Sequence, residues 1–237
     1  MPDLSSTAKT ENLSNPDSLS PAMKSPLAAL DIAAQLCSRL CHDMLSPVGA
    51  LSNGLELLAD EKDPEMRQRC FELLEASARS SADKLKFFRL AFGAAGGFGD
   101  MVPVAEPKAL VEALIGPQGR TTVNWQFNGD SLPKPMVKVL LNFALIAIEA
   151  LVRGGTIDVA CETRAGHSEL VLRAGGPRIA FDEAIGRALS GELGAGELAS
   201  RTAPAAMLHQ LAEALNGHVQ FARSEDALVL GAMLPVG

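Results

Sequence analysis

The feature that most constrains the fold is a long amphipathic segment, Ser38 to Leu51, which reads SRLCHDMLSPVGAL. At about 100° per residue, its apolar side chains fall along one side of a helix, as in helices that pack into a bundle. With the flanking turns, this stripe consists of Cys37, Leu40, Cys41, Met44, Val48, Leu51, Leu55 and Leu58. His42 lies roughly 140° from the centre of the stripe. We therefore predict that His42 stands on the solvent face of the helix.

Composition narrows the class of protein. The chain has 237 residues, enough for one large domain or two small ones, and 47% of them are apolar. Its net charge of −7 argues against a nucleic-acid-binding surface. No apolar run approaches the roughly 18–20 residues of a membrane span, and the start of the chain lacks the pattern of a signal peptide. Four cysteines within apolar patterns favour reduced thiols and a cytoplasmic protein without a membrane anchor.

The first quarter of the chain is predicted to hold a tail and a helix. Residues 1–26 contain six serines and four prolines with almost no periodicity, and are expected to form a disordered tail. The first helix should begin near Ser25 or Pro26 and run to about Ala59. Pro47 lies inside it and lacks a backbone donor, so a local kink is expected there.

A second helix should follow a short acidic loop. Asp63 is suited to be its N-cap, with Pro64 at the first helical position, and the helix should stop at Gly93. Two helices of about 30 residues joined in this way make an antiparallel hairpin, residues 27–93. One hairpin cannot surround its own apolar stripe, whereas two related by a twofold axis form a four-helix bundle. We therefore predict a homodimer.

Beyond residues 94–100, a glycine-rich hinge, residues 101–237 alternate between strand and helix patterns. Helices on one face of a mainly antiparallel sheet would make an α+β two-layer sandwich. Strands are expected at 101–104, 121–127, 156–163, 168–174, 218–223 and 227–234, and helices at 108–115, 133–152, 182–190 and 203–215.

Four segments, in order along the chain, resemble the sequence boxes of sensor histidine kinases. HDMLSP, residues 42–47, resembles the phosphoacceptor box, in which a histidine and an acid are followed by a proline. Residues 140–151, LLNFALIAIEAL, resemble the asparagine box. Residues 173–181 and 201–221 resemble the two glycine boxes. The resemblance covers residues 28–236 and implies that the sandwich has the fold of the kinase ATP-binding domain.

The boxes of the second domain depart from the kinase pattern where ATP would bind. Ile146 stands at the position of an asparagine that helps to hold Mg²⁺ in that family. Ala174 replaces the aspartate that binds adenine, and Arg178 replaces the closing glycine. Residues 201–205, RTAPA, replace a glycine-rich loop whose backbone should approach the phosphates closely. We therefore expect that this chain binds neither ATP nor a metal.

A kinase-like histidine without an ATP site resembles the ChpT-type histidine phosphotransferases, dimeric proteins with a degenerate ATP-binding domain. The resemblance implies that phosphate arrives from the receiver aspartate of a hybrid kinase, CckA-like, and passes through His42. The phosphoryl group is then transferred to the aspartate of a response regulator. In this protein family the recipients are bacterial cell-cycle regulators, CtrA-like and CpdR-like. The resemblance also implies attack by Nε2 of His42 and a Mg²⁺ supplied by the partner receiver domain, so no cofactor is bound by this chain.

The chemistry suits a histidine, because an unperturbed imidazole has a pKa of about 6.5 and a good fraction of it is neutral and nucleophilic at cytosolic pH. Asp43 either orients the ring of His42 through Nδ1, or acts as a weak base, or is simply a solvated acid. Arg39 either meets charge that develops on the phosphate or is an idle solvated arginine. The remaining positions on the face of His42 are candidates for docking a partner or ordinary exposed residues: Ser46, Gly49 and Asn53.

Two other functions fit the same residues less well. One is an ATP-dependent sensor histidine kinase with unusual boxes, and the other is a non-catalytic docking adaptor. A metal cluster of Cys37, Cys41 and His42 is disfavoured because both cysteines lie on the apolar stripe and His42 does not, so the cysteines are expected to pack in the core.

Overall fold

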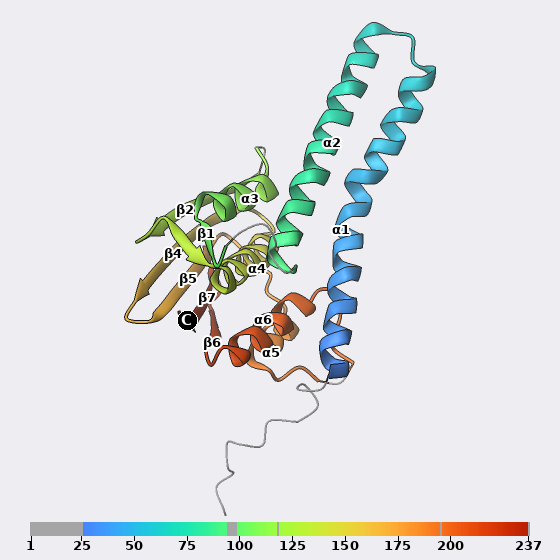
Figure 1. Cartoon of the computed structure of the whole chain (residues 1–237). Coiled ribbons are helices and arrows are strands. Elements are labelled where there is room, and N and C mark those ends of the chain that lie inside the picture. Colours follow the sequence, from blue (N-terminus) through green and yellow to red (C-terminus); the bar gives the residue numbers. More distant parts are fainter. Residues whose placement is uncertain (1–25, 94–98, 118, 195, 237) are drawn as a thin grey trace, which may run out of the picture.

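The computed structural model describes residues 26–93, 99–117, 119–194 and 196–236 (Figure 1). The predicted disordered tail up to residue 25 and residues 94–98 of the predicted hinge lie outside the described residues. Within those ranges, no helix is long and apolar enough to cross a membrane.

The chain begins with the predicted antiparallel hairpin of two helices, α1 (Pro26–Asp60) and α2 (Pro64–Ala91), which projects beyond the rest of the molecule (Figure 1). Asp63 occupies the N-cap position and Pro64 the first turn, as predicted, but the Asp63 side chain makes no capping bond. The Glu61 carboxylate instead accepts hydrogen bonds from the next two backbone N–H groups, both at 2.8 Å. The acidic loop therefore closes on itself before α2 starts.

The second part is a two-layer α+β sandwich, which confirms the predicted fold class of the single chain. Its five-stranded sheet has the order β2-β4-β5-β7-β6, with only β2 and β4 parallel. Alternate residues of β5 are buried against the helices and the others are exposed, so the sheet is covered on one face. The elements are β1 (Met101–Pro103), α3 (Ala105–Ile115), β2 (Thr121–Phe127), β3 (Ser131–Pro133), α4 (Lys134–Ala150), β4 (Gly155–Arg164), β5 (His167–Gly175), α5 (Glu183–Ser190), α6 (Ala203–Ala214), β6 (His218–Arg223) and β7 (Ala227–Pro235).

One strand was not predicted. Residues 131–133, which precede the predicted helix 133–152, form β3 and pair with β1. A strand of three residues is too short to show a recognisable alternation. The helix itself, α4, is shorter than predicted and ends at Ala150, because the chain then turns through Gly154, whose φ of 79° favours glycine.

The hairpin and the sandwich share one hydrophobic core, which contains Phe87 and Phe88 of α2 together with the buried side of α4. Helix α2 packs on α3 and α4, and α1 packs on α6 (Figure 1). The buried Asn142 of α4 adds a polar link, because its Nδ2 donates a hydrogen bond to the carbonyl oxygen of Ala91 at the end of α2. The orientation of α4 relative to the hairpin is therefore fixed by both apolar and polar contacts.

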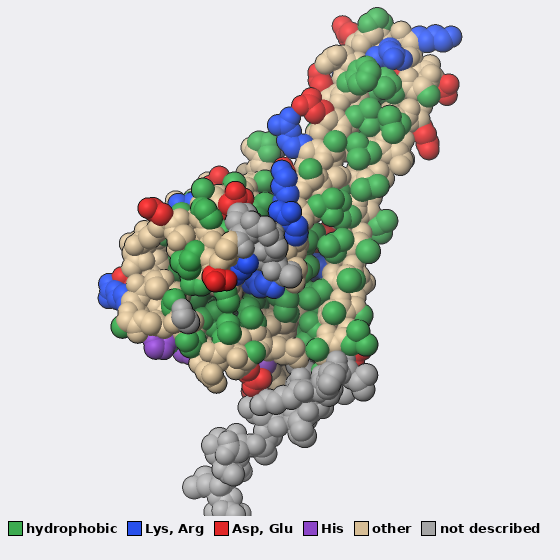
Figure 2. Space-filling model, in the orientation of Figure 1, with side chains coloured by type: hydrophobic (Ala, Val, Ile, Leu, Met, Phe, Trp, Pro, Cys, Tyr) green, Lys and Arg blue, Asp and Glu red, His purple; other side chains and the backbone are tan. Residues whose placement is uncertain are grey.

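The predicted apolar stripe of α1 divides into two faces. Its half-buried members, which include Leu40 and Met44, face the interior. Its exposed members continue a separate apolar face of the hairpin, and Figure 2 shows hydrophobic side chains along the length of the hairpin. That face consists of Leu30, Cys37, Cys41, Leu45, Val48 and Leu55.

The expectation that Cys37 and Cys41 pack in the core is therefore wrong for the single chain, in which both are exposed. Cys70 and Cys161 are buried, and burial raises the pKa of the Cys161 thiol to about 11. A thiol with such a pKa stays protonated at neutral pH and is unreactive.

Candidate functional site

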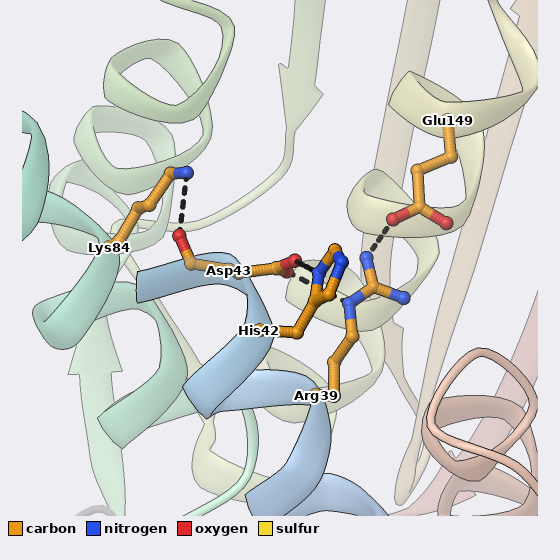
Figure 3. A network of polar contacts seen from close by, with 5 residues as sticks. All are labelled: Arg39, His42, Asp43, Lys84 and Glu149. Atoms are coloured by element: carbon orange, nitrogen blue, oxygen red, sulfur yellow. Dashed lines mark hydrogen bonds and ion pairs between the residues drawn. The ribbon is translucent and has the colours of Figure 1, made fainter. Parts of the chain in front are cut away.

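His42 lies on α1 with its ring directed into solvent, as the helical periodicity predicts. Its side chain is 81% exposed. The surrounding turns of the helix carry the polar contacts of the site, and Figure 3 shows that they come from both helices of the hairpin and from α4. These contacts converge on Asp43, the residue next to His42.

The first contact follows from Pro47. In an α-helix the N–H of residue 47 would bond to the carbonyl oxygen of Asp43, but proline has no N–H. That carbonyl oxygen instead accepts a hydrogen bond from Nζ of Lys84 on α2, at 3.0 Å (Figure 3). The proline thus leaves the carbonyl oxygen of Asp43 free to accept a hydrogen bond. The bond from Lys84 links the two helices at the level of His42.

The Asp43 carboxylate is held between two side chains. Its Oδ2 accepts a hydrogen bond from Nε of Arg39 at 2.8 Å, and its Oδ1 lies 3.1 Å from Nδ1 of His42. Partial burial acts to raise the pKa of Asp43. It is outweighed by the hydrogen bonds from Arg39 and His42 and by the charges of Arg39 and Lys84, so the pKa is lowered from its ordinary value. Asp43 is therefore ionised at neutral pH.

The ionised carboxylate determines where the proton of the neutral imidazole lies. A carboxylate without a proton can only accept, so its bond to His42 requires the hydrogen on Nδ1. The lone pair of the neutral ring is then on Nε2. Since the side chain is exposed, the nucleophilic nitrogen is available to another protein.

Arg39 is the residue for which the sequence was most misleading. Its side chain is only 10% exposed, and besides Asp43 its guanidinium pairs with the carboxylate of Glu149 near the end of α4 (Figure 3). The interpretation of Arg39 as a solvated arginine is wrong, because the sandwich packs over this turn of α1. Arg39 instead connects the sandwich to Asp43, whose carboxylate contacts the ring of His42.

Ser46, Gly49 and Asn53 lie on the same face of α1 as His42, and the two polar ones are exposed. A Cβ added at Gly49 would meet no atom within 4 Å, whereas one at Gly54 would lie 2.9 Å from Cδ2 of Leu74. A larger residue at position 54 would therefore displace the Leu74 side chain, whereas one at position 49 would displace nothing in this chain. A glycine inside a helix costs stability, so Gly49 has no structural reason within this chain.

At the positions where the sequence departs from the kinase boxes, the side chains are either buried in the core or exposed at the surface. Ala174 is fully buried and Ile146 is 4% exposed, so both belong to the core of the sandwich. Arg178 is exposed, and Arg201 lies 3.5 Å from the carboxylate of Asp182. None of these four side chains offers the ligand or the close backbone approach that the kinase boxes supply.

The loop that precedes α6 uses its own backbone donors. The N–H groups of Thr202 and Ala203 both donate to the carbonyl oxygen of Ala199, at 3.0 and 2.9 Å. The Thr202 hydroxyl accepts a further bond from the N–H of Ala199. Pro204 is buried in the first turn of α6 and has no N–H to offer. A phosphate at this helix terminus would therefore find the first donors already paired.

The sequence disfavours a metal cluster of Cys37, Cys41 and His42, and the described residues contain no grouping that contradicts this. In the parts of the chain that the structure describes, no group of three His, Cys, Asp or Glu residues is placed to hold a metal ion.

Two residues of the site, Lys84 and Glu149, were missed by sequence reasoning. Lys84 could have been found from the sequence. Pro47 leaves the Asp43 carbonyl oxygen without its helical donor, and Lys84 lies on the inward side of α2. The second lies in the segment that resembles the asparagine box, but its contact spans 110 residues of sequence. No local pattern identifies such a partner.

The chain is similar to known proteins in both sequence and structure. Residues 104–227 match the model of the histidine phosphotransferase C-terminal domain. Protein phosphotransferase ChpT of Brucella abortus (strain 2308) is 40% identical over 136 residues, which make up 57% of this chain and 63% of that protein. The match thus spans less than two thirds of that relative. A bacterial phosphotransferase solved at 1.7 Å resolution is 29% identical, with a TM-score of 0.73 and coverage of 86% of this chain and 96% of that one.

The lowered pKa of Asp43 predicts a pH dependence of stability. Because the folded-state pKa lies below the unfolded one, the stabilisation by Asp43 is fully present above the ordinary carboxyl pKa and is lost as the pH falls through the folded-state value. Asp43→Asn should therefore lower the free energy of unfolding by roughly 1–2 kcal/mol at pH 7 and by progressively less in acid.

Denaturant unfolding of both proteins between pH 7 and pH 3 measures this difference. Glu56→Gln, at an exposed position of α1, is the control and should show a small, constant effect. A difference between wild type and Asp43→Asn that does not change with pH would contradict the assignment.

Proposed function

Since this chain belongs to the histidine phosphotransferase family, we propose that it relays a phosphoryl group through His42 between the receiver domains of other proteins. The observation that carries this proposal is the exposed ring of His42, whose Nδ1 is held by an ionised Asp43. An imidazole fixed and exposed in this way presents a nucleophile directly at the protein surface. It is suited to meet a phosphorylated side chain that another protein brings to it.

The transfer step needs positioning more than covalent assistance. Nε2 of His42 attacks the phosphorus of an aspartyl phosphate in line with the leaving carboxylate. The N–P bond forms while the acyl P–O bond breaks, and the donor's aspartate departs with the electron pair. The proton on Nδ1 stays in place, paired with Asp43. Transfer to the second receiver is the reverse of this step, with a different aspartate as the acceptor.

The phosphate comes from other proteins rather than from ATP bound by this chain. The paired donors before α6 and the buried Ala174 support this proposal, as does the absence of an asparagine at Ile146. The Mg²⁺ that neutralises the transferring phosphoryl group would be supplied by the receiver domain, so this chain needs no cofactor. We propose a cytoplasmic relay from a CckA-like hybrid kinase to CtrA-like and CpdR-like response regulators.

The test of the relay uses a phosphorylated receiver domain as donor and a regulator receiver as acceptor. Wild-type protein should carry labelled phosphate between them, and His42→Ala should abolish transfer. His218→Ala, at an exposed histidine of the sandwich, is the control and should transfer normally. Labelled ATP with Mg²⁺ but no donor should leave the protein unlabelled.

Two outcomes would overturn the proposal. Labelling of His42 by ATP alone would identify a histidine kinase. Transfer that survives in His42→Ala would identify a docking adaptor.

We also propose that the chain is a homodimer, in which the exposed apolar face of the hairpin packs against its copy. A continuous row of apolar side chains from Leu30 to Leu55 is otherwise left in water. Two hairpins related by a twofold axis would bury these rows in a four-helix bundle.

Substituting the centre of this row tests the dimer. Leu45→Glu should convert the protein from dimer to monomer in sedimentation experiments at micromolar concentration, because it would bury an unpaired charge. Leu57→Glu, at another exposed leucine that lies outside the row, should remain dimeric. A wild-type protein that sediments as a monomer would refute the homodimer.

Gly49 offers a separate test of the docking face. Gly49→Ala should stabilise α1 by about 0.5–1 kcal/mol, since the added methyl group meets nothing in this chain. It should nevertheless slow transfer from the receiver, because the partner's surface would have to approach that point of the helix. Gly54→Ala should instead destabilise the hairpin by pressing on Leu74. Transfer at the wild-type rate by Gly49→Ala would show that no partner approaches there.

A further inference from the structure

A continuous chain of polar contacts runs from the sandwich to the reacting histidine. The Glu149 carboxylate, near the end of α4, pairs with the guanidinium of Arg39. Nε of Arg39 donates to Oδ2 of Asp43 at 2.8 Å, and Oδ1 of the same carboxylate lies 3.1 Å from Nδ1 of His42 (Figure 3). Arg39 and Asp43 each use one atom for the preceding residue and another atom for the next, so the four residues form an ordered series of contacts.

Arg39 depends on Glu149 for its geometry. A guanidinium is a rigid planar fork whose donors point in fixed directions, and burying it without compensating anions is costly. With Nε committed to Asp43, the terminal nitrogen directed at Glu149 fixes the remaining rotation of the plane. Without Glu149, the fork is free to turn and to offer Asp43 its terminal nitrogens instead. The carboxylate would then leave the orientation in which Oδ1 meets the histidine ring.

Glu149 is itself placed by a well-fixed element. Twelve of the 17 residues of α4 are buried, and Asn142 of the same helix donates to the carbonyl oxygen of Ala91 on α2. Asn142 and Glu149 are seven residues apart, about two helical turns, and so lie on one face of α4. This face therefore makes one polar contact with each helix of the hairpin.

We propose that Glu149 is a positioning residue for phosphotransfer at His42. It holds Arg39, which holds Asp43 so that the imidazole keeps its proton on Nδ1 and presents Nε2. The sandwich domain is then part of the phosphotransfer site rather than only a surface that binds partners. This inference rests on the proposed relay function, although its effect on the ring can be measured without any partner.

A purely structural role for Glu149 makes a different prediction. If the ion pair only fastened the sandwich to the hairpin, its loss would lower stability but leave the tautomer of His42 unchanged. The tautomer is therefore the deciding quantity. It is read from long-range ¹H–¹⁵N NMR spectra of the neutral ring in the full-length protein.

The central variant is Glu149→Gln, which keeps the shape of the side chain and removes its charge. The Nδ1–H tautomer of His42 should predominate in the wild type and decline in the variant, while the exposed His218 should not change. With a phosphorylated receiver as donor, kcat should fall about tenfold while KM stays within about twofold, as expected when a nucleophile is misplaced but the docking surface is intact. Glu112→Gln, which removes a carboxylate from α3 that bonds Trp125, is the matched control and should behave as wild type.

A double-mutant cycle then shows whether Glu149 acts through Arg39. In an Arg39→Gln background, the additional Glu149→Gln change should have no further effect on the tautomer or on kcat. Glu149→Asp, which retains the charge, should restore part of the wild-type behaviour.

The outcomes separate the two proposals. A wild-type protein that accepts no phosphate from receivers would refute the relay, whereas the tautomer measurement would still test the positioning role. An unchanged tautomer and kcat in Glu149→Gln, or additive effects in the cycle, would overturn the inference.

Discussion

The arrangement of the site depends on one guanidinium placed between two carboxylates. Arg39 is almost buried, so its charge must be compensated, and the two acids that compensate it come from α1 and from α4. Because Asp43 is also the neighbour of His42, the same pairing that satisfies Arg39 fixes the carboxylate that faces the ring. The Glu149 contact between the two parts of the chain and the position of the Asp43 carboxylate beside the ring therefore both depend on Arg39.

Pro47 supplies the second constraint, since it leaves the backbone oxygen of Asp43 without a helical donor and Lys84 takes that place. Asp43 is thus held through its carboxylate and its main chain, and by side chains of both hairpin helices. The side chain of His42, in contrast, is left exposed with its only described contact at Nδ1. A site that fixes one nitrogen and exposes the other is suited to exchange a group with other proteins, and the altered nucleotide boxes of the sandwich agree with that proposed role.

Sequence reasoning was most successful where a local period determines the outcome. The helical spacing of α1 placed His42 in solvent, and the alternation of buried and exposed residues located the long strands. It failed where burial depends on distant segments. Arg39 was taken for a surface residue, because its partner Glu149 lies 110 positions away in the sequence. Cys37 and Cys41 were assigned to the core, but both are exposed in the single chain. Lys84 was partly predictable. Pro47 indicates that the carbonyl oxygen of Asp43 lacks its helical donor, but the sequence does not show which side chain replaces that donor.

We propose that Asp43 holds Nδ1 of His42 and leaves Nε2 to accept the phosphoryl group. This is tested most directly by locating the phosphate on the ring after transfer from a phosphorylated receiver domain, with ³¹P and ¹⁵N NMR of the labelled protein. The account predicts a phosphoryl group on Nε2 and a retained proton on Nδ1. Phosphate on Nδ1 of His42, or on another residue, would contradict it.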